Sequence, residues 1–244
     1  MDLTEIENAS VHRHPWEISR ADSILKLTGQ FISGSMADIG SGDLYFARQV
    51  TELSGKSLYA CDIHYSDNDI VSPRITKVSS TAEIPAGSIN LVFLLDVLEH
   101  VENEDAFLCN VSSLLQKEGR MIITVPAYQC LFGDHDVFLK HFRRYDKKRL
   151  TKVLVGNDFV VEKIFYFYTS LLLLKGAGKL LSRFGIKREY SNSVSNWKYS
   201  RSDYVTRSLV FLLNLDFFLN RFLHRTLKIS LPGLSLCAIV KKSV

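Results

Sequence analysis

Apolar residues run without interruption through some segments of the chain and recur with helical spacing in others. Residues 89–97 are nearly all apolar, which predicts a strand buried on both of its faces. Residues 103–116 and 146–155 have the apolar spacing of helices, and a glycine lies near the end of each. Strands are predicted from Met36 and over residues 57–63, 75–78, 89–97, 120–125, 159–167 and 235–240. Helices are predicted over residues 15–31, 43–53, 103–116 and 146–155.

This alternation of strands and helices, joined by short loops, predicts an α/β fold. A doubly wound, mostly parallel sheet with helices on both faces is the architecture that such an order favours. We expect an N-terminal helical segment over residues 1–34 and a Rossmann-like core over residues 35–167. A helical insert is expected over residues 168–230, followed by the last core strand within residues 231–244.

A glycine turn between the first strand and the first core helix points to a nucleoside ligand. The turn contains Gly40, Ser41 and Gly42, and Asp62 ends the next strand, where an acid can bind ribose hydroxyls. A dinucleotide fingerprint would need a third glycine where Tyr45 stands. Asp43 would also repel a pyrophosphate at the helix N-terminus. S-adenosylmethionine (SAM) fits this pattern, with its sulfonium and amino groups near Asp38.

Five segments in order resemble the motifs of class I SAM-dependent methyltransferases, of the type 11 subgroup, over roughly residues 35–127. They are Ala37-Asp-Ile-Gly-Ser-Gly42, Leu58-Tyr-Ala-Cys-Asp62, Ser79-Ser-Thr-Ala-Glu-Ile-Pro85, residues 89–101 with their Leu-Glu-His-Val ending, and Gly119-Arg-Met-Ile-Ile-Thr-Val-Pro126. The resemblance implies a seven-stranded sheet whose last strand is antiparallel and lies between the fifth and sixth. It also implies methyl transfer from SAM, bound by Asp38, Gly40, Ser41, Gly42, Asp62, Ile63, Thr81, Ala82 and Asp96. Thr81 departs from the family, which often has Asp there.

A polar segment after the fifth predicted core strand is the candidate for substrate chemistry. Residues 132–146 are similar to a His-Asp-x-x-x-Gly-His-x-Arg-Arg-Tyr pattern of a bacterial methyltransferase subgroup linked to envelope polysaccharide or lipid pathways, with Lys140 in place of glycine. His135 or His141 is a candidate general base. The predicted substrate-binding residues are Asp136, Arg143, Arg144 and Tyr145. Alternatively, each histidine anchors the loop and the arginines pair with neighbouring acids. His100 lies either beside the cofactor or in a loop cap.

Charge divides the chain into an acidic front and a basic back. Residues 1–139 have a net charge of −11, and residues 140–228 have a net charge of +13. In the insert, residues 169–184 predict a helix with a basic stripe of Lys175, Lys179 and Arg183. Residues 207–225 predict a helix with a polar stripe of Arg207, Asn214, Arg221 and Arg225 and an apolar face of Leu209, Phe211, Leu212, Phe218 and Phe222. These helices form either a lid packed on the core or a pair that lies on an anionic membrane.

We therefore predict a SAM-dependent methyltransferase of a small-molecule, saccharide or lipid-linked acceptor. The alternatives are an RNA or protein methyltransferase and a non-catalytic SAM-binding module at a membrane. Only the basic back half supports a nucleic-acid partner, so none is expected. Four scattered cysteines lack metal or disulfide spacing, so no metal site is predicted and free thiols are expected. A cytoplasmic location follows, with contact to the inner face of a membrane if the insert lies on it.

Overall fold

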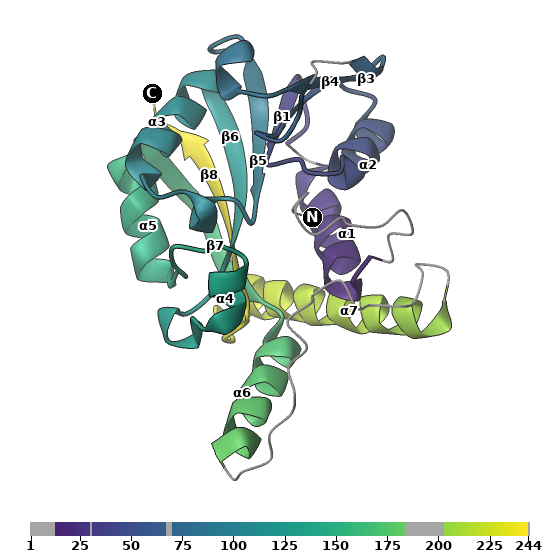
Figure 1. Cartoon of the computed structure of the whole chain (residues 1–244), viewed down its shortest axis with the longest axis vertical. Coiled ribbons are helices and arrows are strands. Elements are labelled where there is room, and N and C mark those ends of the chain that lie inside the picture. The colour runs from purple at the N-terminus through teal and green to yellow at the C-terminus, as the bar shows by residue number, and fades with distance from the viewer. Residues whose placement is uncertain (1–12, 30, 67–69, 184–202, 244) are drawn as a thin grey trace.

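In this computed structural model, which describes residues 13–29, 31–66, 70–183 and 203–243, eight strands form one sheet (Figure 1). The strands are β1 (Met36–Ile39), β2 (Leu58–Cys61), β3 (Ile70–Ser72), β4 (Ile75–Val78), β5 (Ile89–Leu95), β6 (Leu115–Pro126), β7 (Phe159–Phe167) and β8 (Ser235–Lys242). The helices are α1 (Pro15–Thr28), α2 (Tyr45–Ser54), α3 (Glu104–Leu114), α4 (Asp134–Phe138), α5 (Lys147–Gly156), α6 (Thr169–Arg183) and α7 (Tyr204–Thr226). The strand order across the sheet is β3-β4-β2-β1-β5-β6-β8-β7.

The strand directions confirm the predicted fold. The five strands β4, β2, β1, β5 and β6 run parallel, and β8 lies antiparallel between β6 and β7. All seven predicted strands are present, and β3 adds an eighth, an antiparallel edge next to β4. Its two apolar residues, Ile70 and Val71, are too short a run to predict a strand.

Two buried apolar clusters, one on each face of the sheet, hold the layers together. Met36 belongs to the cluster that includes residues of α1, α2 and α7, whereas Ile39 belongs to the cluster with residues of α3 and α5. Residues an odd number apart on a strand face opposite sides, so a single strand serves both clusters. Figure 1 shows α3 and α5 on one side of the sheet and α1 and α2 on the other.

Two predicted boundaries were wrong around the fifth core strand. The helix predicted to reach residue 116 ends at Leu114, and β6 begins at once with Leu115, which is extended (φ −70°, ψ 132°) and pairs with Ile89. Pairing with β5 therefore decides the conformation of a segment that had no strand pattern of its own. Further on, the loop predicted at residues 132–146 contains the short helix α4.

The helical insert lies between β7 and β8, as predicted. In Figure 1, α6 extends away from the sheet, and α7 lies across the end of the molecule beside α1. Of the predicted basic stripe on α6, only the side chain of Lys175 is among those described, and it is half-buried; Lys179 and Arg183 lie outside them. Within the described residues, no helix combines the length and the apolar character needed to cross a bilayer.

The orientation of α7 differs from a lid that packs its apolar face on the core, because much of that face is exposed. Asn214, predicted on the polar stripe, faces α1 and accepts hydrogen bonds from Ser19 Oγ (2.8 Å) and Ser23 Oγ (3.2 Å). Phe211 and Phe218 are 66% and 64% exposed. The helix docks through Thr206, Leu213, Phe217 and Asn220. The serines of α1 explain the difference, because they offer a polar surface to which α7 turns polar residues.

The carboxyl ends of the parallel strands meet at one edge of the sheet. The turn after β1 hydrogen-bonds to the end of β2, through Gly40 N to Cys61 O (2.8 Å), and Asp96 N after β5 donates to Thr124 O of β6 (3.0 Å). The loop after β6 returns to the same edge, where Phe142 N donates to Glu99 O (2.8 Å). Residues far apart in the sequence are thus brought together where α/β folds bind their ligands.

Candidate active site

The turn after β1 needs glycine at position 40. Gly40 has a φ of +75°, and a Cβ there would lie 2.5 Å from Cγ2 of Val97. Gly42 also has a positive φ, of +52°. Any larger side chain at position 40 would therefore strain the backbone and strike the segment that follows β5. The glycine preserves the close approach of two loops as well as space for a ligand.

Asp62 holds this turn in place. Its Oδ2 accepts a hydrogen bond from Gly42 N (2.9 Å), and its Oδ1 accepts one from His64 N (3.0 Å). Tyr65 Oη donates to Gly42 O (2.6 Å) and lies 2.8 Å from Ser41 Oγ. Oδ1 of Asp62 also lies 3.0 Å from Nδ1 of the exposed His64 ring. A carboxylate has about four acceptor positions, so Asp62 keeps one for a ribose hydroxyl, and rotation of the His64 ring would release a second.

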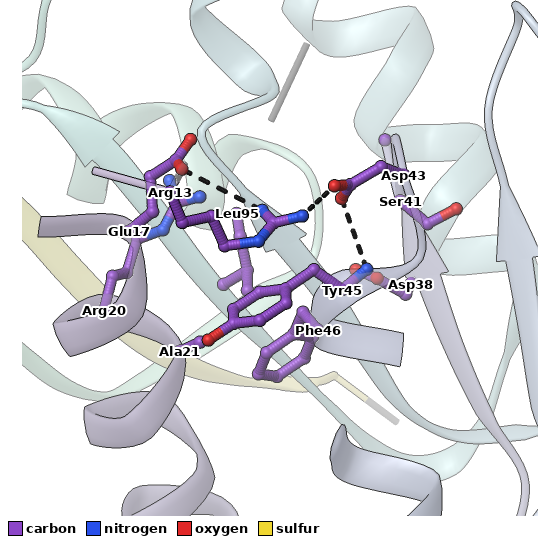
Figure 2. A pocket seen from close by; sticks show the side chains of 11 residues that line it. Arg13, Glu17, Arg20, Ala21, Asp38, Ser41, Asp43, Tyr45, Phe46 and Leu95 are labelled. Atoms are coloured by element: carbon purple, nitrogen blue, oxygen red, sulfur yellow. Dashed lines mark hydrogen bonds and ion pairs between the residues drawn. The ribbon is translucent and has the colours of Figure 1, made fainter. Parts of the chain in front are cut away.

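A pocket opens between this turn and helix α1 (Figure 2). Three predicted cofactor residues line it: Asp38, Gly40 and Ser41. Burial raises the pKa of Asp38 to about 7. Among the described residues, Oε2 of Glu17 has no hydrogen-bond partner, although it is buried, and an arginine nitrogen lies 3.9 Å away.

The other predicted cofactor residues are not part of the pocket lining. Asp62 contacts the turn, and Asp96 lies just beyond Leu95, which is part of the lining. Ile63 is 84% exposed. Thr81 and Ala82 belong to a short 3-10 helix, η2 (Thr81–Glu83), that follows β4.

Two arginines reach into the pocket from the N-terminal side of the protein, and the sequence pattern did not identify them. Arg13 forms an ion pair with Asp43 and stacks on the ring of Tyr45, with Cζ 3.7 Å from its centroid. Arg20 forms an ion pair with Asp96, whose Oδ1 also accepts a hydrogen bond from Thr124 Oγ1 (2.8 Å). Figure 2 shows both arginine side chains among the acids of the pocket.

A signal for Arg20 exists in the sequence. Glu17 and Arg20 occupy the same helical face as Ala21 and Ile24, which are buried. Charged residues on a buried helical face are usually paired or bind a ligand. Burial lowers the pKa of Arg20, whereas Glu17, Glu99 and Asp38 raise it, so this guanidinium lies at the centre of an acidic group.

The pocket fits the charges of SAM. The buried carboxyl of Asp38 and the oxygen of Glu17 that accepts no hydrogen bond among the described residues suit a sulfonium and an amino group. The guanidinium of Arg20 suits an amino-acid carboxylate, because arginine binds carboxylates through paired donors.

The loop after β6 is organised around Asp136, which is fully buried. Its Oδ1 lies 2.9 Å from His141 Nδ1 and accepts a hydrogen bond from Arg144 Nε (2.7 Å). Its Oδ2 accepts from Gly133 N (3.0 Å). Burial opposes ionisation, but the bonds from His141 and Arg144 prevail and hold the pKa of Asp136 well below its usual range. This carboxylate is therefore ionised and fixes the position of His141.

The structure does not place the predicted substrate-binding residues on an open surface. Tyr145 is fully buried, and its hydroxyl donates to Leu98 O (3.3 Å). Arg144 is 4% exposed and pairs with Asp136. Arg143 turns away to Glu104 (Nη1 to Oε2, 3.0 Å). Both arginines thus pair with acids, as the alternative prediction has it. Because Arg144 and Tyr145 are buried, direct contact with the methyl acceptor does not fit either residue.

His135 and Glu99 are the remaining titratable groups of interest. His135 is exposed on α4, and its partial burial lowers its pKa, which favours the neutral imidazole near pH 7. Glu99 belongs to the 3-10 helix η3 (Leu98–His100) and is 1% exposed. Burial raises the pKa of Glu99 to about 8, despite the nearby guanidiniums of Arg20 and Arg144.

Comparison with solved structures shows the same fold in proteins of low sequence identity. Phosphoethanolamine N-methyltransferase 2 of Haemonchus contortus, in complex with phosphomonomethylethanolamine and S-adenosylhomocysteine, superposes with a TM-score of 0.58 at 15% identity. That match covers 96% of this chain and 55% of the other. A SAM-dependent methyltransferase from Archaeoglobus fulgidus gives a TM-score of 0.54 at 16% identity. That match covers 93% of this chain and 94% of the other.

A third structure has a small-molecule ligand. It is 1,6-didemethyltoxoflavin-N1-methyltransferase of Burkholderia thailandensis with bound 1,6-didemethyltoxoflavin and S-adenosylhomocysteine. The TM-score is 0.54 at 13% identity, and the match covers 94% of this chain and 81% of the other. No curated protein matches the sequence. These structural likenesses establish the fold alone.

The match to a family model shows which family the chain belongs to. The model of the methyltransferase domain matches residues 18–170, which is more than half of the chain and includes most of α1, the glycine turn and the loop after β6. The motif resemblance, the confirmed fold and this match agree. The chain therefore belongs to the methyltransferase domain family and is a SAM-dependent methyltransferase.

Proposed function

We propose that this methyltransferase acts on a lipid-linked small molecule or saccharide and receives it at the surface of an anionic membrane. The observation that carries the proposal is the exposed apolar face of α7. Large apolar residues cover it, each at least 36% exposed: Val205, Leu209, Phe211, Leu212, Leu215, Phe218, Leu219 and Phe222. An apolar helical face in water costs free energy that a lipid interface removes.

Basic residues accompany this face. Arg207 and Arg225 of α7 are exposed, and Lys228 follows the helix. They belong to the segment of residues 140–228, which has a net charge of +13. Near an anionic leaflet each such residue contributes about 1 kcal/mol to membrane binding. Insertion of the apolar side chains and attraction of the basic ones therefore favour the same membrane surface. An RNA acceptor would use the charge but would leave the phenylalanines without a role.

In the donor pocket, we assign the chain's residues by charge. SAM supplies a methyl group activated by the positive sulfonium. Asp38 and Glu17 would bind its cationic groups, Arg20 its carboxylate and Asp62 the ribose hydroxyls. Ser41 would stay with Tyr65 as a support of the turn, since the two hydroxyls already contact each other.

His135 is the residue we assign as general base. It lies on α4 at the sheet edge where the donor turn lies, and its lowered pKa leaves it neutral near pH 7. An acceptor hydroxyl would need such a base, whereas an amine with a free lone pair would not. Replacement by Ala should lower turnover on a hydroxyl acceptor by about 10²–10⁴-fold, with SAM affinity unchanged.

Cofactor binding is tested by calorimetric titration with SAM. Asp62→Ala should weaken binding by about 2–3 kcal/mol if two charge-assisted hydrogen bonds are lost. Asp105→Ala is the matched control, because that carboxylate lies on α3 and bonds Asn157 on the opposite face of the sheet. Equal SAM affinity in both folded variants would remove Asp62 from the proposed site.

Membrane binding is tested by sedimentation with vesicles of phosphatidylglycerol and phosphatidylcholine. The wild type should sediment with them, less so as salt rises, because screening shortens to about 8 Å at physiological ionic strength. Phe211→Ser with Phe218→Ser should release the protein, whereas Val155→Ser, at an exposed position of α5, should not. Wild-type protein that stays in the supernatant at low salt would contradict the membrane proposal and leave SAM binding unaffected.

A further inference from the structure

Three side chains with metal-binding atoms meet beside the donor pocket. Glu99 and His100 come from η3 after β5, and His141 comes from the loop after β6. One carboxylate oxygen and one nitrogen from each ring lie no further than 4.8 Å from one another. The two rings meet edge to face, with centroids 4.6 Å apart. We propose that Glu99, His100 and His141 bind one divalent transition-metal ion, with Zn²⁺ as the representative.

The state of Glu99 is the first argument. Its carboxylate is almost completely buried, and among the described residues its Oε2 has no hydrogen-bond partner. A buried polar oxygen without a partner costs about 1–3 kcal/mol, so native proteins seldom retain one without a reason. A cation between this oxygen and the histidines would satisfy it.

The support of His141 is the second argument. Its Nδ1 lies 2.9 Å from Oδ1 of Asp136, which leaves Nε2 available for an ion. Asp136 is itself fixed by Arg144 and by the amide of Gly133. A carboxylate that orients a histidine through its second nitrogen is the usual outer shell of a metal ligand. This gives Asp136 and Arg144 a positioning role that their burial did not allow them as substrate contacts.

The donor set also suits the ion. Two imidazoles and one carboxylate bind Zn²⁺ in catalytic sites and leave a coordination position open. Around Zn²⁺, ligand atoms stand about 3–3.5 Å apart, so small side-chain rotations from the observed separation would close the shell. Asp96 pairs with Arg20, and Asp136 pairs with Arg144, so these charges balance. The carboxylate of Glu99 would therefore supply the negative charge for the cation.

The place of the site indicates what the ion would bind. Arg20 contacts Asp96 and interacts with both Asp38 and Glu99, so it lies between the donor pocket and the ion site. An ion with an open position there would bind an oxygen of the acceptor and lower the pKa of a hydroxyl. The acceptor class is thus a hydroxyl compound. This role rests on the proposed function, whereas the binding of the ion does not.

The experiment is calorimetric titration of chelator-treated, dialysed protein with ZnCl₂. Cys109→Ser with Cys130→Ser serves as the parent, because these exposed thiols could bind Zn²⁺ themselves. We expect one equivalent of Zn²⁺. His141→Ala and His100→Ala should each weaken binding at least about tenfold, and Asp136→Asn about 10–100-fold through its positioning role. His224→Ala on α7 and His135→Ala should leave the affinity unchanged.

A second ion gives an independent readout. Co²⁺ in the same parent should give visible absorption that is lost in Glu99→Gln; if that variant does not fold, His100→Ala provides the comparison. SAM titration of each variant checks the fold and tests the donor site separately. Zn²⁺ binding of less than one equivalent, or equal binding in the parent and the His141→Ala variant, would overturn the metal site even if SAM binds. Zn²⁺ binding without SAM binding would support the metal site and contradict the proposed donor site.

Discussion

The carboxyl of Asp38 is the titratable group in the donor pocket whose charge changes near neutral pH. Burial raises its pKa to about 7, so it is protonated below that pH and ionised above it. Because the sulfonium and amino groups are cationic, SAM should bind the ionised form more tightly. We expect the affinity to rise up to about tenfold per pH unit below 7 and to level off above it. Calorimetric titration from pH 5.5 to 8.5 measures this.

Asp38→Asn is the control for that titration. The amide cannot ionise, so affinity should be weaker and independent of pH over the same range. Folding stability should respond in the opposite direction. The folded protein holds this proton more tightly than the unfolded chain does, so the contribution of Asp38 falls as the pH rises from about 4 to about 7. A wild-type SAM affinity that does not change across pH 7 would contradict the role of Asp38.

Arg20 allows a second test at this scale. Arg20→Met keeps the length of the side chain but removes the ion pair with Asp96. If the guanidinium binds the carboxylate of SAM, affinity should fall by about 2–3 kcal/mol. The same substitution should not change affinity for 5′-methylthioadenosine, which lacks that carboxylate. An equal loss for both ligands would instead indicate a general collapse of the pocket.

The predictability of the site differs from residue to residue for physical reasons. The turn at Gly40 and the place of Asp62 beside it were predictable, because a turn with positive φ and an acid at a strand end have a fixed spacing in the chain. Arg13 and Arg20 were missed, because their partners Asp43 and Asp96 are distant in sequence and helical periodicity does not show which charges are paired. The burial of Tyr145 was not predicted, because a polar loop conceals which of its residues point inward.

At the scale of elements, a residue of another helix caps α6. Asp216 of α7 accepts hydrogen bonds from Thr169 N (3.1 Å) and Ser170 N (2.7 Å), the first amides of α6. Asp216→Ala should destabilise the protein by about 1–2 kcal/mol and speed hydrogen exchange in the first turn of α6. Urea unfolding and exchange mass spectrometry measure both effects. Glu52→Ala, an exposed position on α2, is the control; an equal effect of both variants would contradict the capping role.

Continuous apolar segments such as β5 and β8 were predictable, because burial on both faces requires a nearly unbroken apolar run. Strands whose conformation depends on pairing with a neighbour were not predictable. The start of β6 pairs with β5, and the edge strand β3 pairs with β4. For α7, periodicity defined an apolar and a polar face but not the side that docks. The serines of α1 decide that side through Asn214.

For the whole molecule, α1 connects the donor pocket with the proposed membrane face. It contributes Arg20 to the pocket and contacts α7 through Ser19 and Ser23. We expect SAM to increase the protection of backbone amides in α1 and α7 together, because ordering Arg20 restrains the helix that α7 packs on. Exchange in α5, on the opposite face, serves as the control. Protection of α1 without α7 would show that the two sites are independent.

The place of β8 affects how the protein is made. Every other strand of the described sheet precedes it in the chain, yet β8 fills the position between β6 and β7. Until the ribosome has released this segment, the nascent sheet exposes two unsatisfied apolar edges, and β7 has no neighbour to pair with. The sheet therefore stays divided while the ribosome synthesises the helical insert. During that interval the exposed strand edges can bind chaperones or aggregate.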